Sequence, residues 1–367
     1  MVETAACRSL KNLASRYPII IMCSPRGAAG TALARRLMPT KSYINLEDQT
    51  AFSLAKQSPK TFLLAFPDGV IIDSVQLLPE IVDAMRYHVG RWGFTPGKFI
   101  AISNSTIECD TSDGRVAYCN AFGLTVDDLE DMKRPVANPF KLMHAGQLSD
   151  VTEGKTNLDA LVEEILSKDI RKHINISNLD TFRVFMKNCA LFSTQRLSLN
   201  MVAKQSGISA PTAKVWLSVL QQNLVVRLAY EKGNDSHFSV FFTDTGILCR
   251  LLEIENAESL ILDPYRDRVV RTFAFNELLR GRFSKNLDSD LFIGSLSDFD
   301  ADFREGFSLV VDPNIEVTEG KMAKALQIAS RKAVILHLGD VTYTKDGIDC
   351  ISFRDWTRLA MEIGYFS

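Results

Sequence analysis

Short apolar runs alternate with helix-like segments along the first 150 residues of the chain. The runs cover residues 18–23, 42–46, 69–73 and 98–103, and a helix is expected over residues 31–37. Because the apolar residues in these runs are continuous rather than alternating, the strands are expected to be buried on both faces, as in a parallel sheet. The pattern predicts an α/β domain over residues 1–150.

The middle of the chain is helical. Helical periodicity covers residues 158–173, 179–192, 199–206 and 210–223, and two strand-like runs follow at residues 224–230 and 238–243. A short turn with Gly207 separates the last two helices, and Ser209 is a suitable N-cap for the second. A helix–turn–helix followed by a hairpin predicts a winged helix over residues 193–250, after a helical lid or linker over residues 151–192.

The C-terminal part returns to a mixed pattern. Helices are expected over residues 269–282 and 321–330, and strands over residues 291–295, 307–311, 315–317 and 333–338. We therefore expect a smaller α/β domain over residues 251–367, after the winged helix.

Composition and charge exclude some classes of protein. Hydrophobic residues make up 46% and charged residues 23%, and the formal net charge is −2, which excludes a polycation that binds nucleic acid through bulk charge. No apolar run approaches the ~18 residues of a membrane span. The seven cysteines are scattered without a CxxC pair, as expected for reduced thiols. These features predict a cytoplasmic protein without membrane contacts.

The segment after the first run has the position of a phosphate-binding loop, which reads G-x-x-x-x-G-K-[ST]. It reads, in order, Ser24, Pro25, Arg26, Gly27, Ala28, Ala29, Gly30 and Thr31. Gly30 stands where the loop needs a lysine for the outer phosphates, although backbone donors and the Thr31 hydroxyl remain. The alternative is a plain strand-to-helix turn. A dinucleotide loop is not indicated, because no G-x-G-x-x-G is present.

Two further runs end in polar residues. The third run ends at Asp73, a carboxylate suited to magnesium, but Ser74 follows where a water-activating glutamate is usual. The fourth run ends in Ser103, Asn104 and Ser105, where a polar side chain such as Asn104 would sense an outer phosphate. The order and spacing of these segments favour a nucleotide site.

At this point the sequence resembles predicted AAA-type ATPases of bacteria and archaea, which carry a winged helix and a C-terminal domain similar to PD-(D/E)xK nucleases. The resemblance rests on residues 24–31 (SPRGAAGT), 70–76 (VIIDSVQ), 100–105, 176–185 (ISNLDTFRVF), 199–220, 242–246 (FTDTG) and 315–317. It implies a site for ATP or ADP with magnesium. The residues implied are Ser24, Pro25, Arg26, Gly27, Gly30, Thr31, Asp73 and Asn104.

The departures from the family pattern concern the catalytic groups. The phosphate-binding lysine is Gly30 and the catalytic glutamate is Ser74. Where the family has E-R-D, with an arginine that acts on a neighbouring site, this chain has Lys168 before Asp169, with Arg171 close by as a substitute. Such an arginine is worth ~10³–10⁵ in rate in related enzymes. We therefore expect a pseudo-ATPase with no catalytic residue.

The C-terminal resemblance implies a metal site. Glu277 corresponds to the helix glutamate, Asp302 to the aspartate and Glu316 to the strand glutamate of the nuclease-like fold. The lysine that activates water is replaced by Thr318, with Lys321 three residues further on. The three carboxylates are candidates for holding a divalent ion, and the alternative is that they are ordinary surface acids.

The winged helix is a candidate DNA-binding module, because such modules place their second helix in the major groove. Its candidate contacts are Lys204, Lys214, Arg227 and Lys232. The second helix has only one basic residue, and its apolar residues Val215, Trp216, Val219 and Leu220 are expected in the core. Packing or binding of a partner protein is the alternative.

Three hypotheses about function follow from the sequence. The leading one is a non-hydrolysing scaffold or regulatory protein that acts through a protein partner or self-association and retains nucleotide as a structural ligand. The second is a residual ATPase in which Arg26, Arg35 or Arg36 replaces the missing lysine. The third is a DNA-binding regulator that uses the winged helix.

Overall fold

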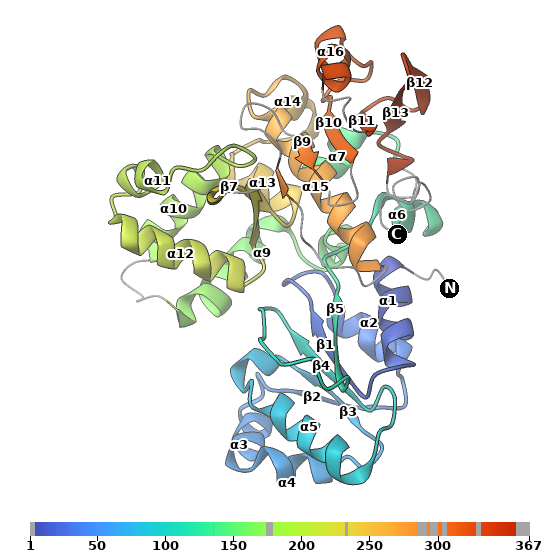
Figure 1. The fold of residues 1–367 in the computed structure, drawn as a ribbon. Helices are drawn as coiled ribbons and strands as arrows, with labels where there is room; N and C mark the ends of the chain where they lie inside the picture. Colours follow the sequence, from blue (N-terminus) through green and yellow to red (C-terminus); the bar gives the residue numbers. More distant parts are fainter. Residues whose placement is uncertain are drawn as a thin grey trace. The chain divides into compact units, whose positions relative to one another are not determined.

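The computed structural model describes residues 4–134, 136–173, 179–231, 234–284, 292–293, 300–302, 307–327 and 332–356. The chain divides into two compact units (Figure 1). The first consists of Met1–Leu124 with Phe283–Leu287, and the second of Thr125–Arg282 with Asp288–Ser367. The division into four domains that the sequence suggests stays a prediction.

The first unit is built on a parallel five-stranded sheet. Its strands are β1 (Ile19–Cys23), β2 (Ser42–Asn45), β3 (Val70–Asp73), β4 (Phe99–Ser103) and β5 (Val116–Asn120), in the order β2-β3-β4-β1-β5. Every residue of β1 and β4 is buried, as their continuous apolar sequence predicts, whereas the edge strand β2 is partly exposed. The four strands expected from the sequence are confirmed, and β5 is an addition.

Helices between residues 5 and 92 accompany this sheet. They are α1 (Ala5–Ala14), α2 (Gly30–Leu37), α3 (Gln49–Gln57), α4 (Pro59–Leu64), α5 (Ile81–Trp92) and η1 (Val75–Leu77). Side-chain caps fix three of the starts: Thr4, Asp48 and Ser58 each accept a hydrogen bond from the backbone of the first turn. The apolar faces of α1 and α2 pack with β1, β3, β4 and β5 in one buried cluster, which holds the carboxyl ends of the strands at one edge.

The second unit begins with short helices. They are α6 (Val126–Asp131), α7 (Pro139–Ala145), α8 (Ser149–Thr152), α9 (Leu158–Glu164), η2 (Ile165–Asp169) and η3 (Ile170–Lys172). The helix expected over residues 158–173 is therefore interrupted, because residues 165–169 form a π-helical segment and residues 170–172 a 3₁₀ turn.

The helices predicted over residues 179–192, 199–206 and 210–223 are present. They are α10 (Leu179–Leu191), α11 (Leu199–Gln205) and α12 (Ala210–Gln222), and the Ser209 hydroxyl accepts a hydrogen bond from the Thr212 amide. Trp216 packs against Phe182 and Phe185, with ring centroids 5.1 and 5.6 Å apart. The prediction that Val215 lies in the core is wrong: 59% of it is exposed. Neighbouring residues on a helix point about 100° apart, so burying Trp216 turns Val215 toward solvent.

The hairpin after α12 is part of a larger sheet. The strands β6 (Val226–Glu231), β7 (Asn234–Phe242), β8 (Phe292–Ile293), β9 (Asp300–Asp302), β10 (Phe307–Val311), β11 (Lys332–His337), β12 (Tyr343–Lys345) and β13 (Ile348–Ser352) form one sheet in the order β12-β13-β11-β10-β9-β8-β6-β7. The remaining helices are α13 (Thr245–Leu251), α14 (Ala257–Leu262), α15 (Arg266–Ser284) and α16 (Glu319–Gln327). Since β6 pairs in parallel with β8, the expected winged helix and nuclease-like region share a sheet.

The strand expected over residues 315–317 is wrong. The chain bends after β10, and the buried carboxylate of Asp312 accepts hydrogen bonds from the backbone and side chain of both Asn314 and Thr318, at 2.7–3.1 Å. These local bonds close a turn over the residues between them, so the segment does not join the ladder. Glu316 is therefore an exposed loop residue.

Candidate functional site

Three elements of the first unit bring polar side chains together at the carboxyl edge of the sheet. The Thr31 hydroxyl of α2 donates to Oδ2 of Asp73 at 2.5 Å, and the Tyr43 hydroxyl of β2 donates to the same oxygen at 2.9 Å. The Ser74 amide donates to Oδ1 at 2.7 Å. In a phosphate-binding site, a hydroxyl at the end of the loop lies beside a carboxylate at the end of a neighbouring strand, and Thr31 and Asp73 have this arrangement. Tyr43 was not singled out in the sequence.

Burial and the neighbouring Asp73 carboxylate raise the pKa of the Tyr43 hydroxyl above its usual range. The hydroxyl therefore keeps its proton near neutral pH and remains a hydrogen-bond donor. The guanidinium of Arg35 lies over the Tyr43 ring, 4.8 Å from its centroid, and fixes the ring from the α2 side. Asp73 is consequently held by three donors.

The loop between β1 and α2 is a tight turn. The Ser24 amide donates to the Ser103 carbonyl at 2.8 Å, which ties the start of the loop to the end of β4. Gly27 and Ala29 have positive φ angles of 86° and 56°, and Ala29, at the N-cap position, supplies no side-chain cap. The first amides of α2 are thus left without a side-chain cap, as a loop that binds an anion requires.

Ser24 and Gly30 are matched in space. A Cβ atom on residue 30 would lie 2.5 Å from Oγ and 2.6 Å from Cβ of Ser24. Rotating the Ser24 hydroxyl away does not relieve the second contact, since Cβ is fixed to the backbone. Ser24 Oγ is itself buried and has no hydrogen-bond partner among the residues that the structure describes. The side chain at position 24 therefore fills the space that a lysine at position 30 would need.

The three arginines considered as substitutes for that lysine all have other contacts. Arg26 forms an ion pair with Glu47 at 3.6 Å, and Arg36 donates from Nη2 to Sγ of Cys7 at 2.8 Å. Arg35, stacked on Tyr43, is connected to Asp73 through the Tyr43 hydroxyl. Among them, Arg26 lies in the loop itself.

The remaining loop and sensor residues lie close by in the same unit. Pro25 is buried directly after β1, and Asn104 is half-buried directly after β4. Ser103 Oγ donates to the Ser105 carbonyl at 2.7 Å and accepts from the Ser105 amide at 3.1 Å, which closes a turn around Asn104. Asn104 follows the strand next to the one that ends in Asp73.

The first unit is a parallel α/β fold with its polar side chains gathered at the carboxyl edge of the sheet. Its sheet is parallel, a glycine-containing loop connects β1 to α2, and a carboxylate stands at the end of β3 beside the α2 hydroxyl. The order of the strands reverses around β1, and ligands of such sheets bind outside the carboxyl ends at this point.

The candidate finger residues lie in the second unit. Lys168, in the π-helical segment, forms an ion pair with Glu164 at 3.4 Å, and both side chains are about half exposed. Arg171 is exposed in the following 3₁₀ turn.

Glu277 belongs to a buried hydrogen-bond network. Its Oε2 accepts from the Val126 amide at 3.0 Å, and its Oε1 accepts from Gln147 Nε2 at 2.6 Å and Arg280 Nη1 at 3.3 Å. Arg280 Nη1 also donates to Gln147 Oε1 at 2.5 Å. The interpretation of Glu277 as an ordinary surface acid is therefore wrong, since the residue is fully buried. These bonds make it a structural carboxylate.

Asp244, in the FTDTG segment, extends this network. Its buried carboxylate accepts from the amides of Gln147, Gly246 and Ile247 at 2.8–3.2 Å, and burial raises its pKa. A Cβ at Gly146 would lie 2.3 Å from Oδ1 of Asp244, and Gly146 has a φ of 77°. The segment thus joins the residues after α7 to α13, a structural role that sequence analysis did not assign.

The predicted metal ligands are not gathered in the described structure. Glu277 uses both oxygens in the buried network, and Glu316 is exposed in a loop. Asp302 lies on β9, and its side chain is outside the described residues. Within the described part of the chain, no group of three or more His, Cys, Asp or Glu side chains is placed to hold a metal ion.

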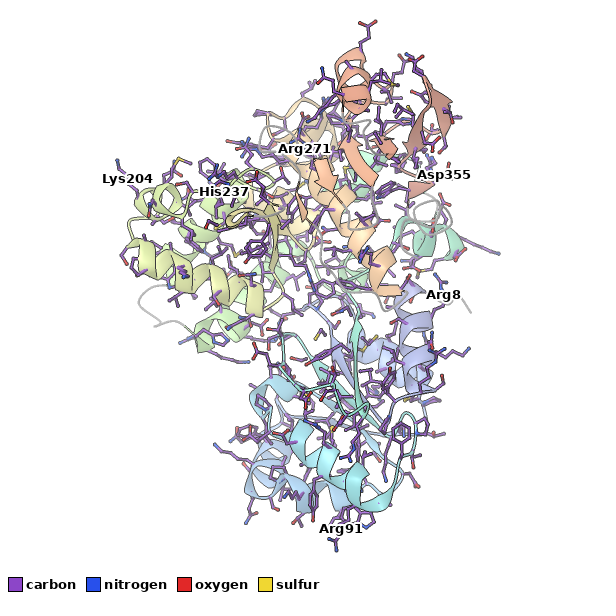
Figure 2. All side chains as sticks on the ribbon, viewed as in Figure 1. Arg8, Arg91, Lys204, His237, Arg271 and Asp355 are labelled. Carbon is purple, nitrogen blue, oxygen red and sulfur yellow. The ribbon has the colours of Figure 1, made fainter. Side chains whose placement is uncertain are left out.

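The predicted DNA contacts differ in exposure. Lys204 and Lys214 are exposed on α11 and α12, and Lys204 points away from the rest of the second unit (Figure 2). Arg227, on β6, is half-buried, and its Nε has no contact with solvent. Lys232 lies outside the described residues. The exposed apolar residues Met201 and Val215 lie on the same two helices as the lysines.

No helix in the described ranges is both long and apolar enough to cross a membrane.

Comparison with known proteins gives one family match and distant structural likenesses. A family described as "Domain of unknown function (DUF8612)" matches residues 147–258. No curated protein matches the chain. A STAND protein (Signal Transduction ATPase with Numerous Domains) with a tetratricopeptide repeat sensor, from Pyrococcus horikoshii, is 13% identical with a TM-score of 0.29. Drosophila ORC bound to DNA is 11% identical with a TM-score of 0.18.

The structural matches cover 76% and 68% of this chain. They cover 47% of the STAND protein and 85% of the ORC chain, so this chain spans about half of the length of the former.

Proposed function

We propose that this protein is a non-hydrolysing relative of the AAA-type ATPases that acts as a scaffold or regulatory protein, with a nucleotide as a structural ligand. The observation that carries the proposal is the contact between positions 24 and 30. A Cβ at residue 30 meets both Oγ and Cβ of Ser24, so the loop has replaced the phosphate-binding lysine and filled its space.

What remains of the site suits binding better than catalysis. The loop amides and the start of α2 supply donors for phosphate oxygens. Thr31 and Asp73 would hold Mg²⁺ with the nucleotide, since their oxygens are adjacent and are hard ligands. The ion would offset part of the phosphate charge that the lysine no longer offsets. Arg26, in the loop, and Asn104, directly after β4, are the other residues that we expect to contact the phosphates.

The groups that accelerate hydrolysis are replaced. Ser74 cannot act as the general base that a glutamate supplies, and its amide is engaged with Asp73. Lys168, paired with Glu164, lacks the planar fork with which arginine binds phosphate. We therefore assign no catalytic residue.

The winged-helix-like region serves as a module for a protein partner in this proposal. Its exposed helix surface combines Lys204 and Lys214 with Met201 and Val215, which are 39% and 59% exposed. Specific DNA contacts call for several phosphate-binding cations on one face. This mixed surface favours a protein partner over DNA. An electrophoretic mobility-shift assay with duplex DNA tests the alternative. Binding of DNA that Lys214→Glu abolishes would favour a DNA-binding function.

Calorimetric titration with ATP and ADP, with and without magnesium, tests the nucleotide part. We expect binding without phosphate release. The double variant Ser24→Gly/Gly30→Lys, which restores both the space and the charge, should bind ATP at least roughly tenfold more tightly, about 1.4 kcal/mol. Gly30→Lys alone is the matched control and should not gain affinity, because Ser24 still occupies the space.

Two outcomes would contradict the proposal. Phosphate release by the wild-type chain that Thr31→Ala and Asp73→Ala abolish would establish a residual ATPase. Absence of binding at millimolar nucleotide, in both the wild type and the double variant, would remove nucleotide from the function altogether.

A further inference from the structure

The C-terminal end of α5 exposes aromatic side chains that contact one another. Tyr87 and Trp92 are 43% and 50% exposed, and their ring centroids are 6.4 Å apart in an edge-to-face arrangement. Phe94, in the loop after α5, is 55% exposed. Large rings left open at a protein surface are typical of an interaction site, because their burial by a partner is favourable.

The indole of Trp92 is supported from the inside of the first unit. The imidazole of His88, about one turn earlier on α5, lies against the indole with the centroids 4.2 Å apart, and it meets Phe99 edge to face at 5.5 Å. Burial, and then the nearby Lys98 ammonium, lower the pKa of the His88 ring, so this ring is uncharged near neutral pH. The indole is therefore held in place at the surface by buried rings.

Cations lie over the same exposed rings. The Lys60 ammonium of α4 lies 4.1 Å from the centroid of the Tyr87 ring, and the Arg91 guanidinium lies 5.6 Å from that of Trp92. Both cations are exposed, and Arg91 lies at the periphery of the first unit (Figure 2). Within the described parts of the chain, neither forms an ion pair with a carboxylate. Their charges are therefore available to an anionic ligand.

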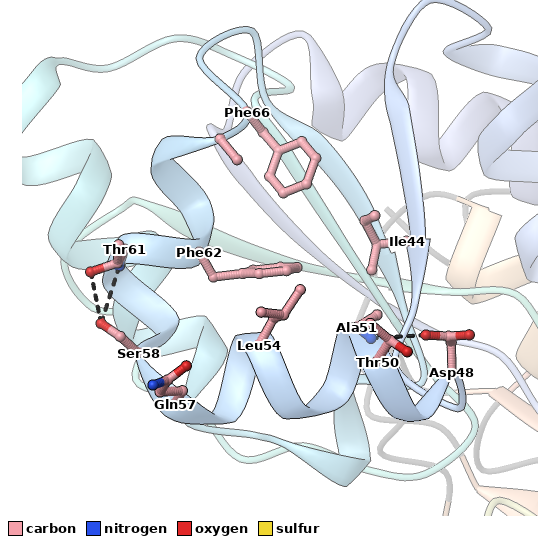
Figure 3. Close-up of a pocket in the computed structure, with 11 residues that line it drawn as sticks. Ile44, Asp48, Thr50, Ala51, Leu54, Gln57, Ser58, Thr61, Phe62 and Phe66 are labelled. Carbon is pink, nitrogen blue, oxygen red and sulfur yellow. Dashed lines mark hydrogen bonds between the residues drawn. The ribbon is translucent and has the colours of Figure 1, made fainter.

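The packing of α4 explains the direction of Lys60. Figure 3 shows Phe62 and Phe66 of α4 on the side of α3 and β2, where they line an apolar groove. Residues two apart on an α-helix point roughly 200° from each other, so Lys60 faces away from this groove and reaches Tyr87 of α5. The contact between Lys60 and Tyr87 thus belongs to the α5 surface and not to the groove.

The sequence around these rings has one sign of charge. Residues 84–107 contain three Lys and Arg residues and no Asp or Glu, and the acidic residue of α5 lies in its first turn. Arg86 is paired with Asp113 at 2.6 Å. Lys98 is only 9% exposed and has no carboxylate partner among the residues that the structure describes. The exposed rings therefore stand in a cationic environment.

We propose that Tyr87, Trp92 and the cations Lys60 and Arg91 form a binding surface for single-stranded nucleic acid. A base stacks on an exposed ring in the place of the long cationic side chain, and the cation moves to a neighbouring phosphate. Rings beside unpaired cations select a ligand that combines flat bases with regular negative charge, and proteins commonly bind single strands in this way. A duplex is disfavoured, because its bases are stacked on each other.

Tryptophan fluorescence gives a readout at the surface itself. The other two tryptophans, Trp216 and Trp356, are 4% and 0% exposed, so quenching by a stacked base reports on Trp92. The probes for the full chain are oligothymidylate and oligouridylate of about 16 nucleotides, with a DNA duplex of the same length for comparison. We expect both single strands to quench the fluorescence, and the tighter of the two shows whether DNA or RNA is preferred. The duplex should bind at least roughly tenfold more weakly.

The stacking component has its own variants, measured by the anisotropy of a labelled strand. Trp92→Ala should weaken binding about tenfold, as expected for the loss of one stacked base. Trp92→Phe keeps a ring and should recover most of the affinity. Leu262→Ala, at an 89% exposed leucine of the second unit, is the matched control and should leave the affinity unchanged.

The charge component is tested by a separate pair of variants. Lys60→Glu/Arg91→Glu should lower the slope of log affinity against log salt by about 1.4, at about 0.7 for each lost phosphate contact. Lys204→Glu/Lys214→Glu changes the net charge by the same amount on α11 and α12 and should have no effect. All four substituted residues are exposed, so circular dichroism should show unchanged folding.

Several results would overturn the proposal. These are the absence of binding of either strand at low salt, binding that Trp92→Ala leaves intact, and binding that only Lys204→Glu/Lys214→Glu abolishes, which would assign it to the helices of the second unit. Vesicles that contain phosphatidylserine test another occupant. A blue shift of the Trp92 fluorescence with these vesicles, without binding of either strand, would identify an anionic lipid surface instead.

Discussion

At the scale of single residues, two of the positions at which the loop departs from the phosphate-loop pattern, Ser24 and Gly30, are coupled in space. Gly30 is small because Ser24 occupies the space next to it, and neither residue can grow without the other changing. A lysine at position 30 would therefore need a change at position 24, which is why introducing the lysine alone should fail.

The first prediction concerns the packing of this pair. Gly30→Ala should destabilise the first unit by about 1–3 kcal/mol, because the new methyl overlaps Ser24. In a Ser24→Gly background the same change should be neutral or stabilising by up to about 1 kcal/mol, because alanine favours a helix. Denaturant unfolding of the four forms gives the coupling energy. Equal effects in both backgrounds would refute the contact.

The second prediction concerns pH and Tyr43. The raised pKa of its hydroxyl means that the folded state holds this proton more tightly than the unfolded state. The contribution of this pKa shift to the free energy of unfolding is fully present below the pKa of the hydroxyl in the unfolded state, about 10. It is lost as the pH rises through the higher pKa of the hydroxyl in the folded state. We expect the free energy of unfolding to fall above this pH in the wild type and less steeply in Tyr43→Phe.

Tyr87→Phe is the control for this measurement, since Tyr87 is exposed and lies under Lys60. At neutral pH Tyr43→Phe should cost about 0.5–1.5 kcal/mol for the lost hydrogen bond to Asp73. Identical alkaline profiles for the wild type and Tyr43→Phe would show that the hydroxyl is not linked to Asp73.

At the scale of elements, the buried network of the second unit connects segments that are far apart in sequence. Glu277 and Arg280 on α15 bond to Gln147 after α7, and Gln147 bonds to Asp244 at the start of α13. Each of these polar side chains forms a hydrogen bond with another, and burying any of them without such a bond would cost free energy. The FTDTG segment thereby has a structural reason for its aspartate, Asp244.

The third prediction separates this role from metal binding. Glu277→Ala should destabilise the second unit by about 3–5 kcal/mol, because it leaves the Arg280 charge buried without its partner. Glu316→Ala, at an exposed loop position, should change stability by no more than about 0.5 kcal/mol. A chelator such as EDTA should not reproduce the Glu277 effect. Stabilisation of the wild type by Mg²⁺ that is lost in Glu277→Gln would favour the metal site instead.

The strands also show where the pattern of apolar residues predicts secondary structure reliably. The apolar runs that became β1, β3 and β4 are continuous, so their burial follows from the sequence, whereas the run that became β2 contains polar residues and is partly exposed. In β5, Tyr118 and Asn120 are only partly buried and break the apolar run, which hid this strand. Residues 315–317 have apolar ends, but Asp312 binds the backbone and side chains on either side and closes a turn.

At the scale of the whole molecule, the chain divides into two compact units. The expected winged helix and nuclease-like region share one sheet through the pairing of β6 with β8. Cooperative unfolding is therefore expected to follow the units.

The fourth prediction follows from this division. Calorimetry should resolve two transitions, with Gly30→Ala lowering the melting temperature of one and Glu277→Ala that of the other. Each variant is the control for its counterpart, since Gly30 belongs to the first unit and Glu277 to the second. A single transition that both variants shift equally would show that the units unfold together.

The sequence by itself determined the apolar strands, the helix–turn–helix elements and the identity of the residues at the lysine and glutamate positions, because these are local patterns. Only the tertiary structure decided that Ser24 fills the space beside Gly30, that Tyr43 donates to Asp73 and that Glu277 is bound by Gln147 and Arg280. Two of these contacts, Tyr43 with Asp73 and Glu277 with Gln147, join residues that are distant along the chain. Their geometry depends on how the strands and helices pack, so no local periodicity encodes them.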